Sequence, residues 1–518
     1  MLAHLEEIGR LLVESRSTRG EERLRARDKL PVRDRIALLL DRDSPFLELS
    51  PLAAWHSYYS VGAGIVTGIG VVSGVECVII ANDPAVLAGA LNPFAMKKIM
   101  RALQIARENR LPLIQFVESA GADLRGGVVD PEIESRLSTF HFGESGRLFY
   151  EISELSKLGI PTIAVVFGSS TAGGAYLPGM SDYSIFIKNR SLVFLAGPPL
   201  VKVATGEDTD EESLGGGVMH AEISGLADYL AQDERHAIGL CRDVVSHLNF
   251  RKLGPGPTLP ADEPVEDAEE LLGLVPADLR SPIDIREVIL RVVDGSRFEE
   301  FKPRYGPELV CGWASVHGFP VGIIANNGVL MNDSALKGAQ FVQLCNRQST
   351  PIIFLQNLTG FIVGLDFERK GITKNGAKMI NAVSNSEVPH ITIMIGASYG
   401  AGNFAMGGRL FGTRFVFLWP SAKIGVMGAK QMSGVMSIVG RKRASRAGEE
   451  FDEAAEAARV ADVEHWAEFR STALYATSRV ADDGIIDPRD TRTVLGLALS
   501  ACHSAPVAGT PGYAVFRM

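Results

Sequence analysis

Two glycine-rich turns are the clearest candidates for chemistry in this sequence. The first follows an apolar run that begins at Ile160, and it reads GSSTAGG, ending at Gly174. The second follows a run that begins at Val388, and it reads GASYGAG, ending at Gly402. Glycine lets the backbone turn sharply and approach a ligand closely. A turn of small residues that leads into a helix exposes backbone N–H donors, which suit an oxygen on which negative charge develops.

Side-chain nucleophiles are poorly supported. The residues around Ser398 fit the nucleophile motif GxSxG, but the matching first turn lacks the closing glycine. His465 and His503 follow this motif in the sequence, and neither has a convincing acid partner. His220 and His390 are isolated, so their pattern favours structural roles. Nucleophilic catalysis is therefore a weak alternative.

Nucleotide-binding motifs are also weak. The sequence contains no GxxxxGK[ST] phosphate loop. Residues 400–405 fit a loose GxGxxA, but no Asp or Glu lies between Glu387 and Glu449 to bind a ribose hydroxyl. The remaining candidates are the backbone donors of the two turns, which could stabilise the enolate of a thioester or another oxyanion. The alternative is that Gly173-Gly174 and Gly400–Gly402 only allow a helix to pack closely on a strand.

The two turns occupy equivalent positions of an internal repeat. Upstream, residues 111–114 resemble residues 350–353, and Asn82-Asp83 resembles Asn326-Asn327. Looking for such repeats identifies two versions of one domain. The matched pairs, each 228 positions apart, are Pro161 with Pro389, Gly168 with Gly396, and Gly174 with Gly402.

Strands, turns and helices alternate through both halves, which predicts α/β domains built on parallel sheets with crossover helices. Residues 252–282 are rich in proline and acid, so they are the best linker candidate between an N-terminal domain, 1–251, and a C-terminal domain, 283–518. Residues 1–40 predict a charged helical arm. We interpret this arm as solvated, and a clamp over a neighbouring domain is the alternative. Residues 441–470 predict one exposed helix.

Composition limits the function further. The 518 residues carry a net charge of −9 without long runs of one sign, which argues against nucleic acid as a partner. No apolar run approaches the roughly 20 residues of a membrane span, and no secretory signal is visible, so we expect a cytoplasmic protein. The cysteines show no metal-binding spacing and are expected to be reduced, buried thiols: Cys77, Cys241, Cys311, Cys345 and Cys502.

Nearly the whole chain resembles the carboxyltransferase (beta) subunits of biotin-dependent acyl-CoA carboxylases. The resemblance extends from ARDKLPVRDRIALLLD through STAGGAY, FLAGPPLVKVATGE and SGLADYLA to LVPADLRSPIDIREVI, NNGVLMNDSALKGAQFVQLC, SYGAGNFAMGGR and DDGIIDPRDTR. The wording FVQLCNRQSTPIIFLQNLTGFIVG is similar to the 3-methylcrotonyl-CoA carboxylase branch.

This resemblance implies a duplicated crotonase-like fold and the activity of the carboxyltransferase component of a ligase complex. It implies that Gly173-Gly174 hold the acyl-CoA thioester oxygen and that Ala401-Gly402 hold the ureido oxygen of biotin. No side-chain base or metal is then needed. The residues expected to contact the cofactor are Ala175, Gly400, Asn403, Phe404, Gly121 and Ala122.

The same resemblance implies partners. Biotin is expected on a separate alpha subunit, because the nearest match to a biotinyl AMKM motif, Ala95–Lys98, lies in a predicted core helix. A homodimer is the expected minimum and a hexamer the expected assembly. Two departures, Phe404 in place of Tyr and Lys430 in a GAKQ sequence, leave the acyl group open. Propionyl-, acetyl-, geranyl- and longer acyl-CoA carboxylases are alternatives, as are a membrane-associated decarboxylase and a non-catalytic scaffold.

Overall fold

The computed structural model describes residues 1–16, 18–123, 146–276, 283–448 and 451–517. It divides the chain into two compact units. The N-terminal unit comprises Ile8–Leu253 and Ser478–Val480. The C-terminal unit comprises Met1–Glu7, Gly254–Thr477 and Ala481–Met518.

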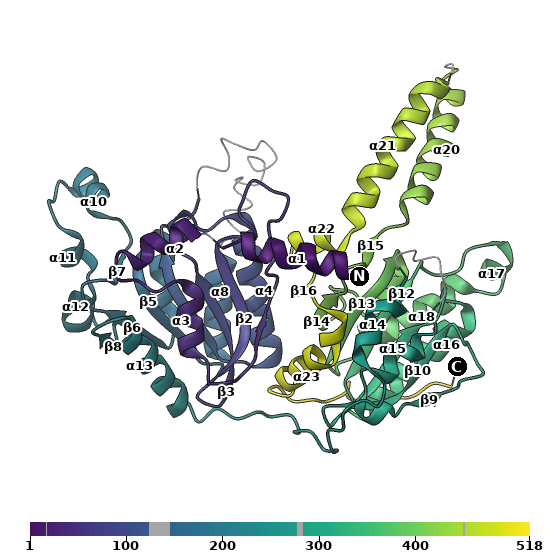
Figure 1. Ribbon diagram of the computed structural model, residues 1–518, viewed down its shortest axis with the longest axis horizontal. Coiled ribbons are helices and arrows are strands. Elements are labelled where there is room, and N and C mark those ends of the chain that lie inside the picture. The colour runs from purple at the N-terminus through teal and green to yellow at the C-terminus, as the bar shows by residue number, and fades with distance from the viewer. Residues whose placement is uncertain (17, 124–145, 277–282, 449–450, 518) are drawn as a thin grey trace. The chain divides into compact units, whose positions relative to one another are not determined.

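The N-terminal unit is built on one mixed sheet (Figure 1). Its strand order is β1-β2-β3-β4-β5-β6-β8, and β7 pairs with the end of β5. The pairs β1–β2 and β2–β3 are antiparallel, and the pairs from β3 onward are parallel. The strands are β1 (Phe46–Glu48), β2 (Ile65–Val72), β3 (Val75–Asn82), β4 (Leu113–Ser119), β5 (Thr162–Thr171), β6 (Tyr183–Ile187), β7 (Leu192–Phe194) and β8 (Tyr229–Ala231).

Helices cover this sheet because their apolar faces need burial. Alternate residues of β4 and β5, such as Phe116 and Phe167, form one apolar core with α3 and α13. Helices α4 and α8 pack against each other and against β2, β3 and β5. The helices used below are α1 (Leu2–Glu14), α2 (Thr18–Arg25), α3 (Val32–Leu39), α4 (Pro93–Asn109), α8 (Arg147–Lys157), α9 (Tyr176–Met180), α10 (Pro198–Thr205) and α13 (Glu234–His247).

The C-terminal unit repeats this plan. Its strand order is β16-β14-β13-β12-β11-β10-β9, and β15 pairs with the end of β13. Its core joins α16 and α18 to strands β10, β11 and β12. The elements are β9 (Glu299–Phe301), β10 (Leu309–Val316), β11 (Phe319–Asn326), α16 (Asn332–Arg347), β12 (Ile352–Leu358), α17 (Leu365–Arg369), α18 (Ile372–Ser384), β13 (His390–Tyr399), α19 (Ala401–Ala405), β14 (Thr413–Leu418), β15 (Lys423–Gly425), α20 (Ala429–Ala447), α21 (Glu453–Ser471), α22 (Ala473–Ser478), β16 (Gly484–Ile485) and α23 (Thr491–Cys502).

The predicted α/β class is confirmed: both units are parallel-rich sheets with crossover helices, and the second unit repeats the first. Strands β2 and β3 form a hairpin, as do β10 and β11, and each hairpin pairs over eight registered positions. All five cysteines are buried, as predicted. Within the described ranges, no helix is both long enough and apolar enough to cross a bilayer.

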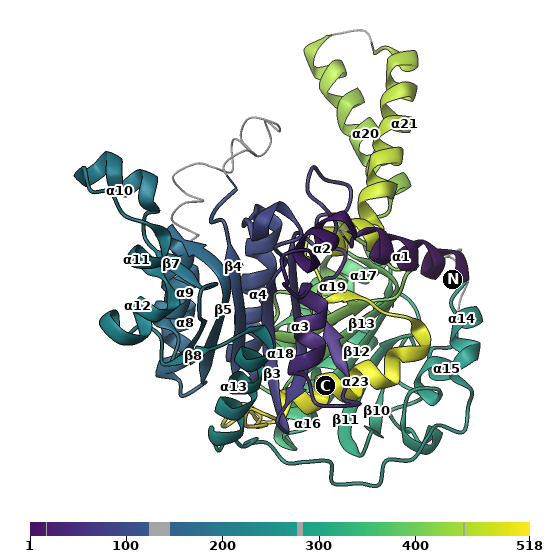
Figure 2. The ribbon, with the colours of Figure 1, turned by 60° about the vertical axis from the view of Figure 1, so that its left-hand side comes forward.

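Two expectations about helices are wrong. The segment predicted as a solvated arm folds onto its own unit: Leu24, Val32, Ile36 and Leu39 are buried. The predicted single helix 441–470 is a hairpin of α20 and α21, which begins earlier and is interrupted where Gly448 adopts a positive φ of 70°. Figure 1 and Figure 2 show this hairpin extending away from the sheet of the C-terminal unit.

Candidate functional site

The first glycine turn lies at the carboxyl end of β5. The strand runs to Thr171, and a short 3₁₀ turn, Ala172–Ala175, then leads into α9. Ala172 has a φ of 52°, which reverses the chain direction. Gly173 is exposed, whereas Gly174 and Ala175 are buried. The first N–H groups of a helical turn have no carbonyl within that turn to bond, so the donors are those of residues 172–174.

The second glycine turn repeats this geometry at the carboxyl end of β13. The strand ends at Tyr399, and α19 begins at Ala401. Gly400, the counterpart of Ala172, has a φ of 61°, and its N–H donates to the carbonyl oxygen of Gly425 at 3.0 Å. Ala401 is exposed and Gly402 is buried, as in the first turn. The two turns are therefore alike in backbone as well as in sequence.

A neighbouring loop brings Gly121 and Ala122 beside the first turn. Ser119 is in register with Ser170, and a Cβ on Gly121 would lie 3.8 Å from Thr171 Oγ1. Ala122 forms an isolated bridge with Leu91. The second half has the same loop. There, Phe361 forms an isolated bridge with Leu330, and Gly360 lies against Gly402. The structure thus places Gly121, Ala122, Ala175 and the first turn together.

The first glycine of each motif lies within a strand, although the sequence pattern suggested that the strand ends at this glycine. These residues are Gly168 in β5 and Gly396 in β13. The neighbouring strand shifts register beside each of them, at Glu118 in β4 and at Asn357 in β12. A Cβ on Gly168 would lie 2.6 Å from Glu118 Oε1, and one on Gly396 would lie 2.3 Å from Asn357 Oδ1. These glycines leave room for polar side chains beneath the turns.

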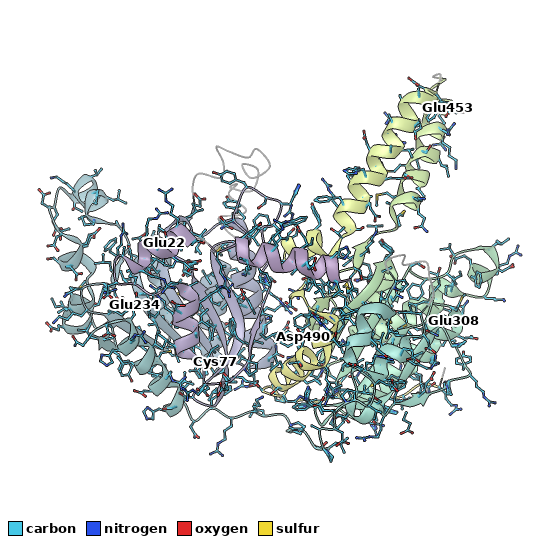
Figure 3. The ribbon with its side chains drawn as sticks, viewed as in Figure 1. Glu22, Cys77, Glu234, Glu308, Glu453 and Asp490 are labelled. Carbon is cyan, nitrogen blue, oxygen red and sulfur yellow. The ribbon has the colours of Figure 1, made fainter. Side chains whose placement is uncertain are left out.

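Glu118 belongs to a buried charged network that sequence reasoning missed. Arg35 Nη1 donates to Glu118 Oε2 at 2.9 Å, and Lys29 contacts the other carboxylate oxygen. Arg35 also donates to both oxygens of Glu234, at 2.9 and 3.2 Å, and its guanidinium lies 4.3 Å from the centroid of the Phe167 ring. Figure 3 labels Glu234 on α13. The sequence feature that could have indicated this network is the ARDKLPVRDRI segment, in which basic residues alternate with apolar ones.

Ser398 lies in a different kind of network, below the second turn. It is fully buried, and its Oγ donates to Gln356 Oε1 at 2.5 Å. Asn403 Nδ2 donates to Ser398 Oγ at 2.8 Å. The hydrogen-bond partners of this serine hydroxyl within the described residues are these two amides, with no histidine among them, and it is not accessible, so the structure gives it no nucleophile-elbow geometry. Phe404, the next predicted residue, is half exposed and stacks on Phe411 at a centroid distance of 5.2 Å.

The histidines are held by structural contacts. His220 Nε2 lies 2.7 Å from the carbonyl oxygen of Val193, and its Nδ1 lies 2.7 Å from Ser224 Oγ. His390 is buried, which lowers its pKa to about 3, and it contacts Ser386. A neutral buried imidazole of this kind does not supply a general base at neutral pH.

The Ala95–Lys98 match to the biotinyl motif lies within α4, as the sequence predicts. Lys97, which takes the place of the motif's lysine, is exposed, whereas Lys98 is buried and donates to the carbonyl oxygen of Ile65 at 2.7 Å. Burial lowers its pKa to about 8. Among the described residues, no group of three or more His, Cys, Asp or Glu side chains could hold a metal ion. A surface hollow of about 470 Å³ is lined by Lys302–Tyr305 and includes no predicted site residue.

The turns combine accessible backbone donors with tight packing. Gly173 and Ala401 are exposed, so their N–H groups can meet a substrate oxygen. Gly402, by contrast, must be small, because a Cβ there would lie 2.2 Å from Leu358 Cδ1. Close packing therefore operates at Gly402, and it is compatible with donation by the same backbone. Two sites of this kind fit a reaction in which negative charge develops on one oxygen and then on another.

Comparisons with known proteins agree with this geometry. The carboxyl transferase domain profile matches residues 23–511. A probable biotin-dependent acyl-coenzyme A carboxylase beta2 subunit of Mycobacterium tuberculosis is 56% identical, over 100% of this chain and 96% of its own length. A mitochondrial methylcrotonoyl-CoA carboxylase beta chain of Dictyostelium discoideum is 48% identical, over 95% of this chain and 83% of its own.

A solved structure adds the fold. The geranyl-CoA carboxylase beta subunit of P. aeruginosa superimposes with a TM-score of 0.89 at 40% sequence identity, and the match covers 100% of this chain and 96% of that one. The resemblance found in the sequence motifs is confirmed. With its duplicated sheets, paired glycine turns and a profile match over most of its length, the chain belongs to the carboxyl transferase family as a carboxyltransferase (beta) component of the biotin-dependent acyl-CoA carboxylases.

Proposed function

We propose that this chain transfers a carboxyl group from carboxybiotin, carried on a partner alpha subunit, to 3-methylcrotonyl-CoA. The observation that carries the proposal is the repeated turn: an exposed donor followed by a buried glycine, at Gly173-Gly174 and again at Ala401-Gly402. A relative named for methylcrotonoyl-CoA supports the substrate. Biotin, when bound, supplies the transferable carboxyl group and the base, which fits turns around which the described residues offer no suitable side-chain base.

The chain's own part is to hold two oxygens. Gly173-Gly174 would donate to the thioester oxygen as negative charge develops when the substrate loses a proton. Ala401-Gly402 would donate to the ureido oxygen of biotin. Ala175, Gly121 and Ala122 would line the acyl-CoA side, because they lie around the first turn. On the biotin side, the lining residues would be Gly400, Asn403 and Phe404. Fixed backbone donors need no reorganisation during the reaction.

The domain assignment is part of the proposal. Residues 1–251 would form the acyl-CoA domain, 252–282 the linker and 283–518 the biotin domain. We also propose a homo-oligomer, a dimer at least and a hexamer in the full complex, located in the cytoplasm. Two surfaces support self-association: α10 exposes Leu200 and Val203, and α20 exposes Ile438 and Val439. Exposed apolar side chains that are gathered on one helix favour a protein contact.

The leading alternative is another acyl group. The geranyl-CoA carboxylase subunit superimposes with a TM-score of 0.89, so a larger acyl chain is the second candidate. Phe404 and the loop at Gly360 lie at the second turn, on the proposed biotin side, so their volume would discriminate among acyl groups where the acyl chain reaches that side. Acetyl- and propionyl-CoA are the smaller alternatives.

The test is carboxyl transfer in reverse. The purified chain would be mixed with free biotin and, separately, with 3-methylglutaconyl-CoA, carboxylated geranyl-CoA, methylmalonyl-CoA and malonyl-CoA. Loss of the carboxyl group from 3-methylglutaconyl-CoA at the highest kcat/KM would support the proposal. Preference for another thioester would reassign the substrate. No turnover of any thioester by an intact oligomer would favour a non-catalytic scaffold.

A further inference from the structure

A buried group of three polar side chains lies directly beneath the second turn. We call it the amide cluster: Gln356 on β12, Ser398 on β13 and Asn403 on α19. Exposure is 0% for Gln356 and Ser398 and 8% for Asn403. A buried polar group that lacks a hydrogen bond is costly, so three such residues in one place need a reason.

Every bond in the amide cluster has a compatible donor and acceptor. Ser398 Oγ donates to Gln356 Oε1 at 2.5 Å, and Asn403 Nδ2 donates to Ser398 Oγ at 2.8 Å and to Gln356 Oε1 at 3.3 Å. Gln356 Nε2 donates to the carbonyl oxygen of Met406 at 2.6 Å. Fully satisfied networks of this kind make a local structure rigid.

The cluster closes the segment that carries the donors. The Asn403–Ser398 bond joins two residues that flank Gly400, Ala401 and Gly402, so the turn becomes part of a hydrogen-bonded ring. Gln356 ties that ring to β12 before it and, through Met406, to the end of α19 after it. Gly408 leaves room for this arrangement, because a Cβ there would lie 2.3 Å from Asn403 Oδ1. The N–H groups of Ala401 and Gly402 thereby have a fixed direction.

The first turn lacks this support. The residues equivalent to Gln356, Ser398 and Asn403 are Val117, Ser170 and Ala175. Ser170 is fully buried, and its Oγ has no hydrogen-bond partner within the described residues. The serine is repeated but its two amide partners are not, so the amide cluster is specific to the second turn.

We infer that Gln356, Ser398 and Asn403 are positioning residues of the Ala401-Gly402 donors, and that they determine use of biotin but not of acyl-CoA. This inference rests on the proposed assignment of the second turn to biotin. Ser398 and Gln356 act through the backbone, since both are inaccessible to any substrate, and Asn403 links them to the helix that carries the donors.

The experiment compares Ser398→Ala with Ser170→Ala in reverse carboxyl transfer by the full chain, with free biotin as acceptor. Ser398→Ala is expected to lower kcat/KM for biotin by about 10- to 100-fold, since small misplacement of positioned groups has effects of that size, and to leave KM for the thioester unchanged. Ser170→Ala, the matched control, is expected to leave both parameters unchanged. Gln356→Met, which keeps the volume but removes the donor and acceptor, should reproduce the Ser398→Ala effect.

Equal loss for biotin and thioester, or no loss in Ser398→Ala, would overturn the inference. Amide hydrogen exchange gives a readout independent of turnover: Ser398→Ala should speed exchange in residues 399–406 and leave 171–180 unchanged, and an unchanged 399–406 segment would also overturn it. A wild-type chain that turns over none of the thioesters would overturn the proposed function instead, while the exchange result would still decide whether the cluster positions the turn.

Discussion

Replacing Arg35 with methionine should destabilise the N-terminal unit by about 3–5 kcal/mol, the loss typical when one partner of a buried ion pair is removed. The side chain of Arg35 is 1% exposed, and those of Glu118 and Glu234 are 11% and 4% exposed. Two opposite charges about 4 Å apart attract by roughly 4 kcal/mol at an effective dielectric constant of 20. In the variant, Lys29 would remain beside Glu118 and Arg190 would remain 3.9 Å from Glu234, but both carboxylates would lose their buried partner, so much of this attraction would be lost.

Arg33→Met provides the matched control. Arg33 lies on the same helix, α3, and donates to both oxygens of Glu48 at 2.8 Å, but these side chains are 33% and 21% exposed. Solvent-exposed pairs contribute about 0–1 kcal/mol, and a partly exposed pair should lie near the top of that range. The geometry is similar and the burial differs, so the comparison isolates the effect of burial.

The assay is hydrogen exchange followed by mass spectrometry of peptides from β4 and β5, because it reports on the N-terminal unit alone. Arg35→Met should accelerate exchange in residues 113–119 and 162–171 far more than Arg33→Met does. Equal effects of the two substitutions would refute the reasoning. A smaller loss in the double variant Arg35→Met/Glu234→Gln than in Arg35→Met would confirm that uncompensated charge is the cause.

Three further substitutions test other features. Ala172→Gly should raise the free energy of unfolding by about 0.5–1 kcal/mol, because relief of the strain at a φ of 52° exceeds the added chain entropy; an unchanged urea midpoint would contradict this. The variant Gly173→Ala should fold normally, since a Cβ there comes no closer than 3.6 Å to Phe149. It should raise the KM for the thioester but not the KM for biotin. An unchanged thioester KM would refute the acyl-CoA assignment. Burial raises the pKa of Asp482 from 3.8 to about 7 in the folded state. The folded state therefore keeps this proton where the unfolded state has already lost it, so the free energy of unfolding falls by about 4 kcal/mol as the pH rises from about 4 to 7. Asp482→Asn should flatten that fall in urea midpoints measured from pH 4 to 8, and parallel curves for the variant and the wild type would contradict the assignment.

The fold followed from local patterns. Apolar periodicity and turn residues predict the β2–β3 hairpin, α4 and β4, and the internal repeat predicts their counterparts in the second half. The same patterns failed at residues 441–470, where alanine, glutamate and arginine favour a helix throughout but do not mark the turn between α20 and α21. Figure 3 labels Glu453 near that turn, where it pairs with Arg441 across the hairpin.

The support beneath the turns was not predictable from spacing. Arg35 is 83 positions from Glu118 and 199 from Glu234, so no local period connects them. Gln356 is 42 positions from Ser398. Each contact forms only because parallel strands and a helix bring distant residues together. The sequence did predict the turns themselves, because Gly400 allows a positive φ and Gly402 allows close packing.

The two halves thus keep one backbone and differ in what lies beneath it. In the N-terminal unit the residue at the register shift is Glu118, an anion balanced by Lys29 and Arg35. In the C-terminal unit it is Asn357, a neutral amide that accepts from the N–H of Ala397. A duplicated turn can diverge in this way because its donors belong to the main chain, which no substitution other than proline removes. Changes in the buried side chains then alter how firmly each pair of donors is held, so two copies of one turn can serve two different oxygens.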